Sequence, residues 1–140
     1  MSAIDHLLSR DEHRALVEEY RAIESAEEKL SWLMERPPLH TPVPGHLITP
    51  ERRVPGCLSG LWLHGEAGTE TCTFSAKSDS DMVQGIASFI CDLYSHRTPE
   101  EILSIKDTLV SVLGLERLLS TTRKRAVSST IAFIQNSAKR

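Results

Sequence analysis

The chain has 140 residues, enough for one domain, and a domain of this size hides roughly 68 to 70% of its unfolded surface. Its formal net charge is −3 with acidic and basic residues interspersed, which excludes a broad basic face for nucleic acid or anionic lipid. The first residues hold neither a long apolar stretch nor a cationic start followed by a small-residue cleavage site. We therefore expect a cytoplasmic protein without membrane contact, folded as a single domain over residues 1–140.

Residues 11–36 carry apolar side chains at helical spacing with a break near Ser25, which predicts two helices. Ser25 and Glu28 have the spacing of a capping box, so the second helix is expected to begin there. Residues 37–55 contain six of the seven prolines. Because proline removes a backbone donor and fixes φ, this stretch is excluded from regular helix and from a central strand. We expect an extended strap across the fold.

Beyond the strap, two runs of alternating apolar residues, at 59–65 and 69–76, predict a β-hairpin. Residues 78–95 begin with serines and aspartates and then place apolar side chains on one arc, which predicts an amphipathic helix. Thr98 begins a capping box for the next helix, and a last helix follows a break around 120–122. Strands flanked by runs of helices, without β-α-β alternation, indicate an α+β fold.

The three cysteines are separated by wide gaps, which argues against a disulfide framework and against paired zinc knuckles. No metal site is predicted, because no two Cys or His residues have the close spacing of zinc ligands. Motifs of serine hydrolases, metalloproteases and phosphate-binding loops are absent from the sequence. Cys72 and Cys91 fall on or at the edge of apolar faces, so we expect structural or incidental roles for them. Five histidines are expected at the surface or in loops: His13, His40, His46, His64 and His96.

Cys57 has the most unusual local setting, in the segment RRVPGCLSGLW. Gly56 lacks a Cβ and Pro55 stiffens its approach, so the pair favours a tight turn that projects the next side chain toward a large partner. A nucleophilic cysteine reacts as the thiolate, which cations stabilise, and Arg52 and Arg53 are close in sequence. Packing is the alternative interpretation, because free cysteine is among the most buried residue types.

Three cations cluster in TTRKRA, residues 121–126, at the start of the last predicted helix. A helix N-terminus is the unfavourable end for positive charge, so this placement costs a little stability. Either the cluster is a solvated patch, or one of its arginines braces the cysteine loop or a carboxylate of a partner.

Several separated motifs resemble the SufE family of sulfur acceptors, which includes CsdE. The family's central motif, V-P-G-C-x-S-x-x-W, is matched by Val54, Pro55, Gly56, Cys57, Ser59 and Trp62. Its S-D-S-D and T-P-E-E-I helix starts resemble residues 78–81 and 98–102, and its L-G-L-x-x-H-L-S-P-x-R resembles residues 113–123 and places the family's arginine at Arg123. The resemblance covers about residues 25–135. The family's histidine, proline and later glycine are replaced here by Leu118, Thr121 and Ala126.

The resemblance implies a protein that activates a pyridoxal-phosphate-dependent cysteine desulfurase and accepts its sulfur, which it relays to a scaffold of iron–sulfur cluster assembly. Cys57 would carry the sulfur as a persulfide, supported by Gly56, Ser59 and Arg123. Such a chain is a persulfide-carrying partner rather than a stand-alone enzyme. It needs no cofactor of its own, because pyridoxal phosphate belongs to the desulfurase. The implied fold is SufE/IscU-like, with a small three-stranded antiparallel sheet packed against helices.

Two other functions remain open at this point. The family fold is similar to that of IscU-type scaffolds, which hold zinc or a nascent cluster with several cysteines, so a metal or iron–sulfur cluster scaffold is the alternative. This sequence lacks that set of ligands. A pure interaction domain with a silent cysteine is the other possibility. If a persulfide is carried, we expect the loop to shield Cys57 at rest, with apolar Val54 and Leu58 beside the thiol.

Overall fold

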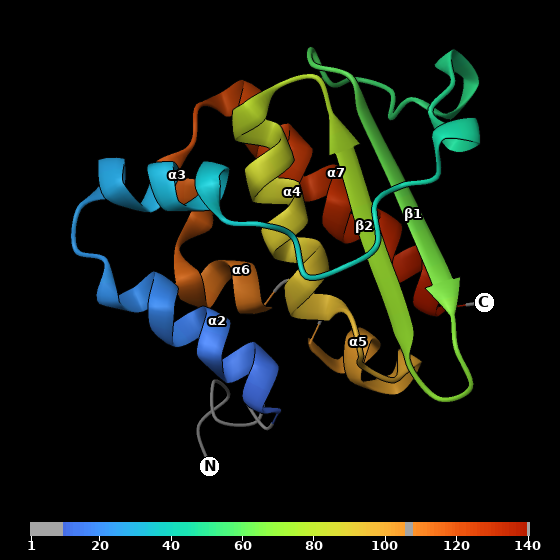
Figure 1. The fold of residues 1–140 in the computed structure, drawn as a ribbon, viewed down its shortest axis with the longest axis horizontal. Helices are drawn as coiled ribbons and strands as arrows, with labels where there is room; N and C mark the ends of the chain where they lie inside the picture. Colours follow the sequence, from blue (N-terminus) through green and yellow to red (C-terminus); the bar gives the residue numbers. More distant parts are fainter. Residues whose placement is uncertain (1–9, 106–107, 140) are drawn as a thin grey trace.

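The computed structural model describes residues 10–105 and 108–139 of the chain. Figure 1 shows helices gathered beside and behind a long hairpin. The described residues form six α-helices and a two-stranded antiparallel sheet, which confirms the expected α+β class. The first nine residues, on which the prediction of no export signal partly rests, lie outside the described part.

The two predicted N-terminal helices are present as α2 (Asp11–Ala22) and α3 (Ala26–Glu35). The Ser25 hydroxyl accepts a hydrogen bond from the Glu28 backbone N–H at 3.0 Å, so the predicted cap does begin α3. On α2 the buried side chains recur at helical spacing and face the core: Leu16, Val17 and Tyr20, together with His13. The local signals in this region therefore decide both helices.

The hairpin consists of β1 (Leu61–Ala67) and β2 (Cys72–Ser78), paired from Leu61 opposite Ser78 to Ala67 opposite Cys72. The pairing runs further into the turn than predicted, because Glu66 and Ala67 continue the ladder. The expected third strand is wrong for the described residues, which form only two. The strap crosses the sheet, but its prolines cannot donate to a ladder. Its last part makes one backbone–backbone bond to β1, from the Val54 N–H to the Leu61 carbonyl at 2.8 Å, and its Thr49 carbonyl accepts from Trp62 Nε1 at 2.7 Å.

Helix α4 (Asp81–Tyr94) is the central element and packs against α3, β2 and the last helix, α7 (Thr121–Ala138). Ser80 caps α4 by accepting from the Val83 N–H at 3.3 Å. The remaining helical elements are α5 (Pro99–Ile105), α6 (Thr108–Leu113) and the 3-10 turn η3 (Leu115–Leu118). Gly114, with φ of 65°, separates α6 from η3.

The proline-rich segment 37–55 forms the expected strap, with only two short 3-10 turns, η1 (Gly45–Leu47) and η2 (Pro50–Arg52). In Figure 1 it crosses in front of β2 before it turns up to the start of β1. Its first residues are anchored on α4, where Asp92 accepts hydrogen bonds from the Arg36 and His40 side chains and from the Leu39 backbone N–H. The strap is thus tied to the core at its beginning.

One buried cluster joins the helices and the sheet into a common core, with Phe74 of β2, Phe89 of α4 and Ile134 of α7 all nearly inaccessible. The upper end of the molecule in Figure 1 brings together three features that are distant in sequence. They are the loop before β1, the start of α4 and the start of α7. This convergence positions the candidate site.

Candidate functional site

Cys57 lies in the loop of residues 54–60, called the cysteine loop below, between η2 and β1. Gly56 has φ of 82°, in the left-handed region that glycine occupies without steric cost. The bond from the Val54 N–H to the Leu61 carbonyl closes the base of the loop. The turn predicted from Pro55 and Gly56 is therefore confirmed, and it places the thiol at the end of the sheet.

The thiol opens into a pocket of about 370 Å³ between the cysteine loop, the start of α4 and the start of α7. Cys57 itself is half-buried, and its Sγ lies 4.0 Å from the Ser129 hydroxyl of α7. Three of the residues singled out in the sequence share this pocket: Cys57, Ser59 and Arg123. Gly56, the fourth, shapes the turn. The rest of the lining is mainly hydroxyl and apolar, from Ser80, Ser120 and Ala126 among others.

Two arginines hold the backbone of the cysteine loop. Arg125 donates from Nη1 to the Gly56 carbonyl at 3.1 Å. Arg53 donates from Nη2 to the Cys57 carbonyl at 3.4 Å and to the Leu58 carbonyl at 3.0 Å. Three successive carbonyls are therefore satisfied by guanidinium groups from two separate segments. Arg125 therefore braces the cysteine loop, which was one of the two roles considered for the cations of residues 121–126.

Sequence reasoning did not single out Arg125 or the bracing role of Arg53. The available signal was the cation cluster itself, in which positions 123 and 125 lie about 200° apart around an α-helix. Arg123 lines the pocket while Arg125 reaches the loop backbone, so the two arginines take separate positions around the thiol.

The shielding expected of the loop is only partly present. Cys57 and Val54 are half-buried, but the Leu58 side chain is 80% exposed and adds little cover. Leu58 stands between the thiol pocket and a second hollow of about 420 Å³ lined by Thr49, Trp62 and Asp79. Leu58 therefore lies beside the thiol in the pocket lining, as expected, but its exposed side chain does not shield the thiol.

The other two cysteines are core residues, as expected. Cys72 is 8% exposed and Cys91 is 1% exposed. Burial raises the pKa of both thiols, and the Asp92 carboxylate raises that of Cys91 further. Both therefore stay protonated at neutral pH, and among the three cysteines only Cys57 meets a pocket that a partner can enter.

Metal ligands do not gather at the thiol. Within the described ranges, no group of three or more His, Cys, Asp or Glu side chains is arranged to hold a metal ion. The lining of the thiol pocket contains serines and an arginine but no second sulfur, imidazole or carboxylate. This set of donors does not fit a zinc ion or an iron–sulfur cluster, which needs several thiolate or imidazole ligands.

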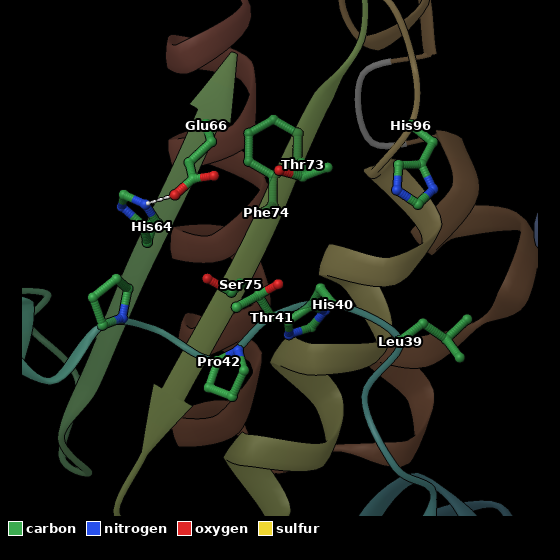
Figure 2. Close-up of a pocket in the computed structure, with 11 residues that line it drawn as sticks. Leu39, His40, Thr41, Pro42, His64, Glu66, Thr73, Phe74, Ser75 and His96 are labelled. Atoms are coloured by element: carbon green, nitrogen blue, oxygen red, sulfur yellow. Dashed lines mark hydrogen bonds and ion pairs between the residues drawn. The ribbon is translucent and has the colours of Figure 1, made fainter. Parts of the chain in front are cut away.

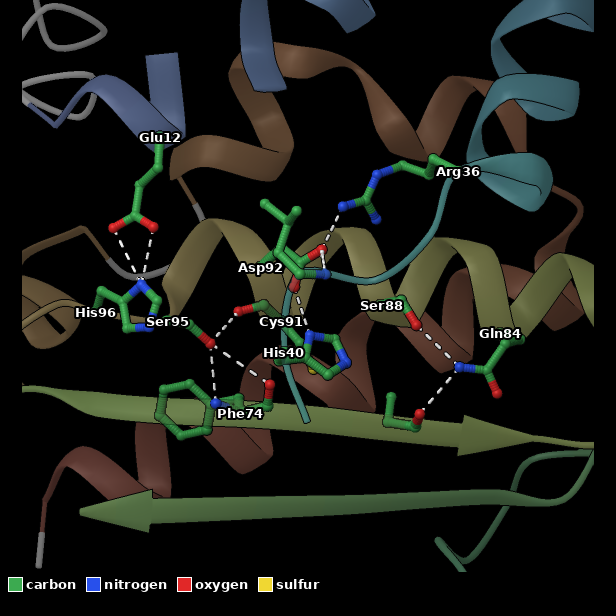
Figure 3. A network of polar contacts seen from close by, with 12 residues as sticks. Glu12, Arg36, His40, Phe74, Gln84, Ser88, Cys91, Asp92, Ser95 and His96 are labelled. Carbon is green, nitrogen blue, oxygen red and sulfur yellow. Dashed lines mark hydrogen bonds and ion pairs between the residues drawn. The ribbon is translucent and has the colours of Figure 1, made fainter. Parts of the chain in front are cut away.

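A third pocket, of about 160 Å³, lies between the strap and the two strands of the sheet. Figure 2 shows its histidines on three separate segments: His64, which pairs with Glu66, is on β1, His40 is on the strap, and His96 follows the end of α4. The polar contacts in Figure 3 fix His40 on Asp92 and His96 on Glu12. This pocket is separate from the thiol site.

Asp92 is the most buried carboxylate of that network, with its side chain 1% exposed. Burial alone would raise its pKa, but the hydrogen bonds from His40 and Arg36 hold the pKa below the ordinary value. His40 lies in a loop, as one of the two expected settings had it, but its side chain is only 6% exposed. The pair fixes the strap that leads to the cysteine loop.

His13 departs from the expected surface or loop position, because it is fully buried on α2. Its Nε2 donates to the Ser95 carbonyl at 2.8 Å, and its Nδ1 has no hydrogen-bond partner among the described residues. Burial and the nearby Arg97 guanidinium lower the pKa of His13 to about 4. The helical position of His13, three residues before Leu16 on the buried face, was the signal for this burial.

The fold and the site define a small α+β protein that presents one half-buried thiol on a loop braced by arginines. The family model of SufE, described as an Fe-S metabolism associated domain, matches residues 14–138. The chain belongs to the SufE family. Among the described residues, no helix is long and apolar enough to cross a membrane.

Curated relatives agree with this assignment. SufE-like protein 1, chloroplastic/mitochondrial, of Arabidopsis thaliana is 27% identical over 124 residues, which are 88% of this chain and 33% of that protein. An uncharacterized SufE-like protein of Mycobacterium tuberculosis is 29% identical over 113 residues, covering 78% of this chain and 79% of the relative. A chloroplastic quinolinate synthase of Nicotiana tabacum is 26% identical over 135 residues, 93% of this chain. The chain spans only 19% of that synthase's length.

The fold has a counterpart among solved structures. The solution structure of a hypothetical protein from Thermus thermophilus matches with a TM-score of 0.69. The match covers 91% of this chain and 93% of the other at 18% sequence identity, so it shows a shared fold.

Proposed function

We propose that this chain takes sulfur on Cys57 from the persulfide of a pyridoxal-phosphate-dependent cysteine desulfurase, stimulates that enzyme, and passes the sulfur to an acceptor in iron–sulfur cluster assembly. Family membership supports a role in iron–sulfur metabolism. The observation that carries the finer proposal is the setting of Cys57, a half-buried thiol at the mouth of an open pocket with Arg123 in its lining. The cytoplasmic location and the single domain over residues 1–140 stay predictions.

The transfer is a thiol–persulfide exchange. The Cys57 thiolate attacks the outer sulfur of the desulfurase persulfide, a new S–S bond forms, and the bond between the two partner sulfurs breaks. The desulfurase cysteine leaves as a thiolate, and Cys57 now carries the outer sulfur with its proton. No oxidant or reductant is consumed, because one sulfur–sulfur bond replaces another.

Such an exchange requires a thiol that the partner's persulfide can approach and that reacts as a thiolate; it does not require a general base. The turn at Pro55 and Gly56 supplies the reach, since it places the thiol ahead of the sheet at the molecular surface. Arg123 lines the same pocket, so a cationic side chain is available to the sulfur that is transferred there. Ser59 adds a hydroxyl donor on the same wall.

The hydrogen bonds to the loop backbone support the same function. With the Gly56 and Cys57 carbonyls engaged by Arg125 and Arg53, the thiol is held in a defined place before a partner arrives. The scaffold alternative has no comparable support, because the pocket offers a single sulfur ligand.

The test is stimulation of a purified Suf-type cysteine desulfurase, followed as alanine released from L-cysteine. The unchanged chain should raise the turnover, Cys57→Ser should not, and Cys72→Ala should retain the effect because Cys72 lies in the core. Full stimulation by Cys57→Ser would overturn the proposal. Iron or zinc that stays bound through purification, and is lost in Cys57→Ser, would favour the scaffold instead.

A further inference from the structure

Two segments that border the cysteine loop, residues 52–53 and the first turns of α7, carry five cationic residues: Arg52, Arg53, Arg123, Lys124 and Arg125. All five are exposed. Among the described residues, no carboxylate forms an ion pair with any of them, although ion pairs are found elsewhere on Arg10, Arg14, Arg36 and Arg97. The cationic charge at this end is therefore available to a partner.

The contacts that Arg53 and Arg125 do make leave much of their binding capacity unused. Each guanidinium has five N–H donors, and these two engage only the neutral carbonyls of residues 56–58. Hydrogen bonds from guanidinium to carboxylate are roughly twice as strong as bonds between neutral groups. An incoming carboxylate would therefore compete well for these arginines.

An apolar side chain stands at the centre of the cationic rim. The side chain of Leu58 is 80% exposed, more than that of Met34, Leu39 or Val112, the other exposed large hydrophobic residues of the described chain. It separates the thiol pocket from the hollow beside Trp62, so a surface that fits here meets one apolar projection between two depressions. A central apolar anchor with a charged rim is the usual anatomy of a protein interface.

We infer that this face binds a protein partner that presents carboxylates around an apolar recess, with Leu58 in the recess and the arginine rim on the carboxylates. The inference rests on the proposed function, because it gives the surface chemistry of the desulfurase that delivers sulfur to Cys57. A protein fits better than a nucleic acid, because Asp79 lines the hollow beside Leu58, the centre of the face is apolar, and the whole chain has a net charge of −3.

Docking and the state of the cysteine loop are linked in this arrangement. Partner carboxylates that take the guanidinium groups of Arg53 and Arg125 remove the donors from the carbonyls of residues 56–58. The loop then loses its brace at the moment when the partner's persulfide is near. Arg52 and Lys124 make no side-chain hydrogen bond or ion pair within the described ranges, so they report on docking alone.

The experiment uses the full chain with a purified Suf-type cysteine desulfurase. The concentration that gives half-maximal stimulation is measured at several salt concentrations for three proteins. These are the unchanged chain, the double variant Arg52→Gln/Lys124→Gln, and the control Arg21→Gln on α2. We expect the double variant to need about fivefold more protein for half-maximal stimulation and to depend less on salt, because exposed charge pairs at an interface rim contribute modestly and are screened. The control should match the unchanged chain.

A second variant tests the apolar centre. Leu58→Ser should raise the half-saturating concentration about tenfold, because the complex loses the apolar side chain that it would bury. The salt dependence should not change, because no charge is removed. Because the Leu58 side chain is 80% exposed, its replacement should not disturb folding.

The outcomes separate this inference from the proposed function. If the unchanged chain never acquires sulfur on Cys57, the proposed function fails. If sulfur is acquired but neither variant changes the half-saturating concentration, the docking surface is wrong and the function stands. Competition by a short DNA duplex at physiological salt would also overturn the inference, because the cations would then serve a polyanion.

Discussion

Arg125 donates a hydrogen bond to the Gly56 carbonyl, 3.1 Å away, across 69 positions of sequence. This contact ties the first turns of the last helix to the turn that presents the thiol. Its loss in Arg125→Ala should cost less than about 1 kcal/mol of unfolding free energy, because the bond is exposed to water. Hydrogen exchange of the amides in residues 56–58 should quicken, and stimulation of a desulfurase should fall.

Lys124→Ala is the matched control for Arg125→Ala, because it removes a neighbouring cation that does not touch the loop in the described structure. Exchange in residues 56–58 should stay as in the unchanged chain. Equal exchange in all three proteins would mean that the arginine does not brace the loop.

Gly56→Ala should strain the cysteine loop. Gly56 has φ of 82°, where a Cβ costs about 1 to 2 kcal/mol, while the nearest atoms to that Cβ would be those of Arg125 at an ordinary 3.7 Å. The cost is therefore in the backbone and not in a clash. Chemical denaturation should show a loss of about 1 kcal/mol, whereas Gly45→Ala, with open space around its Cβ, should be nearly neutral or stabilising. Equal stability of the two variants would contradict the left-handed turn.

The strap should loosen when its anchor on α4 loses its charge. Asp92→Asn leaves the Arg36 guanidinium, whose side chain is 6% exposed, without its anionic partner, and it weakens the bond from His40. Breaking a buried pair in this way should cost about 3 kcal/mol. Asp81→Asn, at the exposed start of the same helix, should cost below about 1 kcal/mol. Comparable midpoints in urea for the two variants would show that Asp92 is not an anchor.

Stability should fall on mild acidification because of His13. Its pKa in the folded protein is about 4, below the usual value of 6.5. Between these two pH values His13 is therefore protonated in the unfolded chain and neutral in the folded chain. The contribution of neutral His13 is complete above pH 6.5 and is lost as the pH falls toward 4. About 2 kcal/mol should disappear between about pH 7 and about pH 5.

Denaturant titrations at both pH values compare the unchanged chain with two histidine variants. His13→Gln should remove most of the pH dependence in that window, while His46→Gln, at an exposed position, should keep it. A dependence that survives in His13→Gln would place its origin in another group.

The helix starts were predictable because a cap is a local device. Ser25 and Thr98 bond to backbone N–H groups three residues ahead, at 3.0 and 3.2 Å, and the residues involved are visible in a short window of sequence. The turn that presents Cys57 was predictable for the same reason, since Pro55 and Gly56 define it alone.

Other features depend on contacts between distant segments and were not predictable in the same way. Whether Arg123 or Arg125 would reach the loop depends on how α7 is rotated against β1, which packing decides. The number of strands depends on whether the strap pairs along the sheet or crosses it. The continuation of β1 through Glu66 and Ala67, poor strand formers, follows from the register of the hairpin.

The most direct test of the account is to find where the transferred sulfur lies. The chain is incubated with a cysteine desulfurase and L-cysteine without reductant, and its peptides are mapped by mass after the free thiols are blocked. The account predicts one additional sulfur atom on the peptide that contains Cys57 and none on those that contain Cys72 or Cys91. An unmodified Cys57 peptide, or the same sulfur uptake by Cys57→Ser, would contradict it.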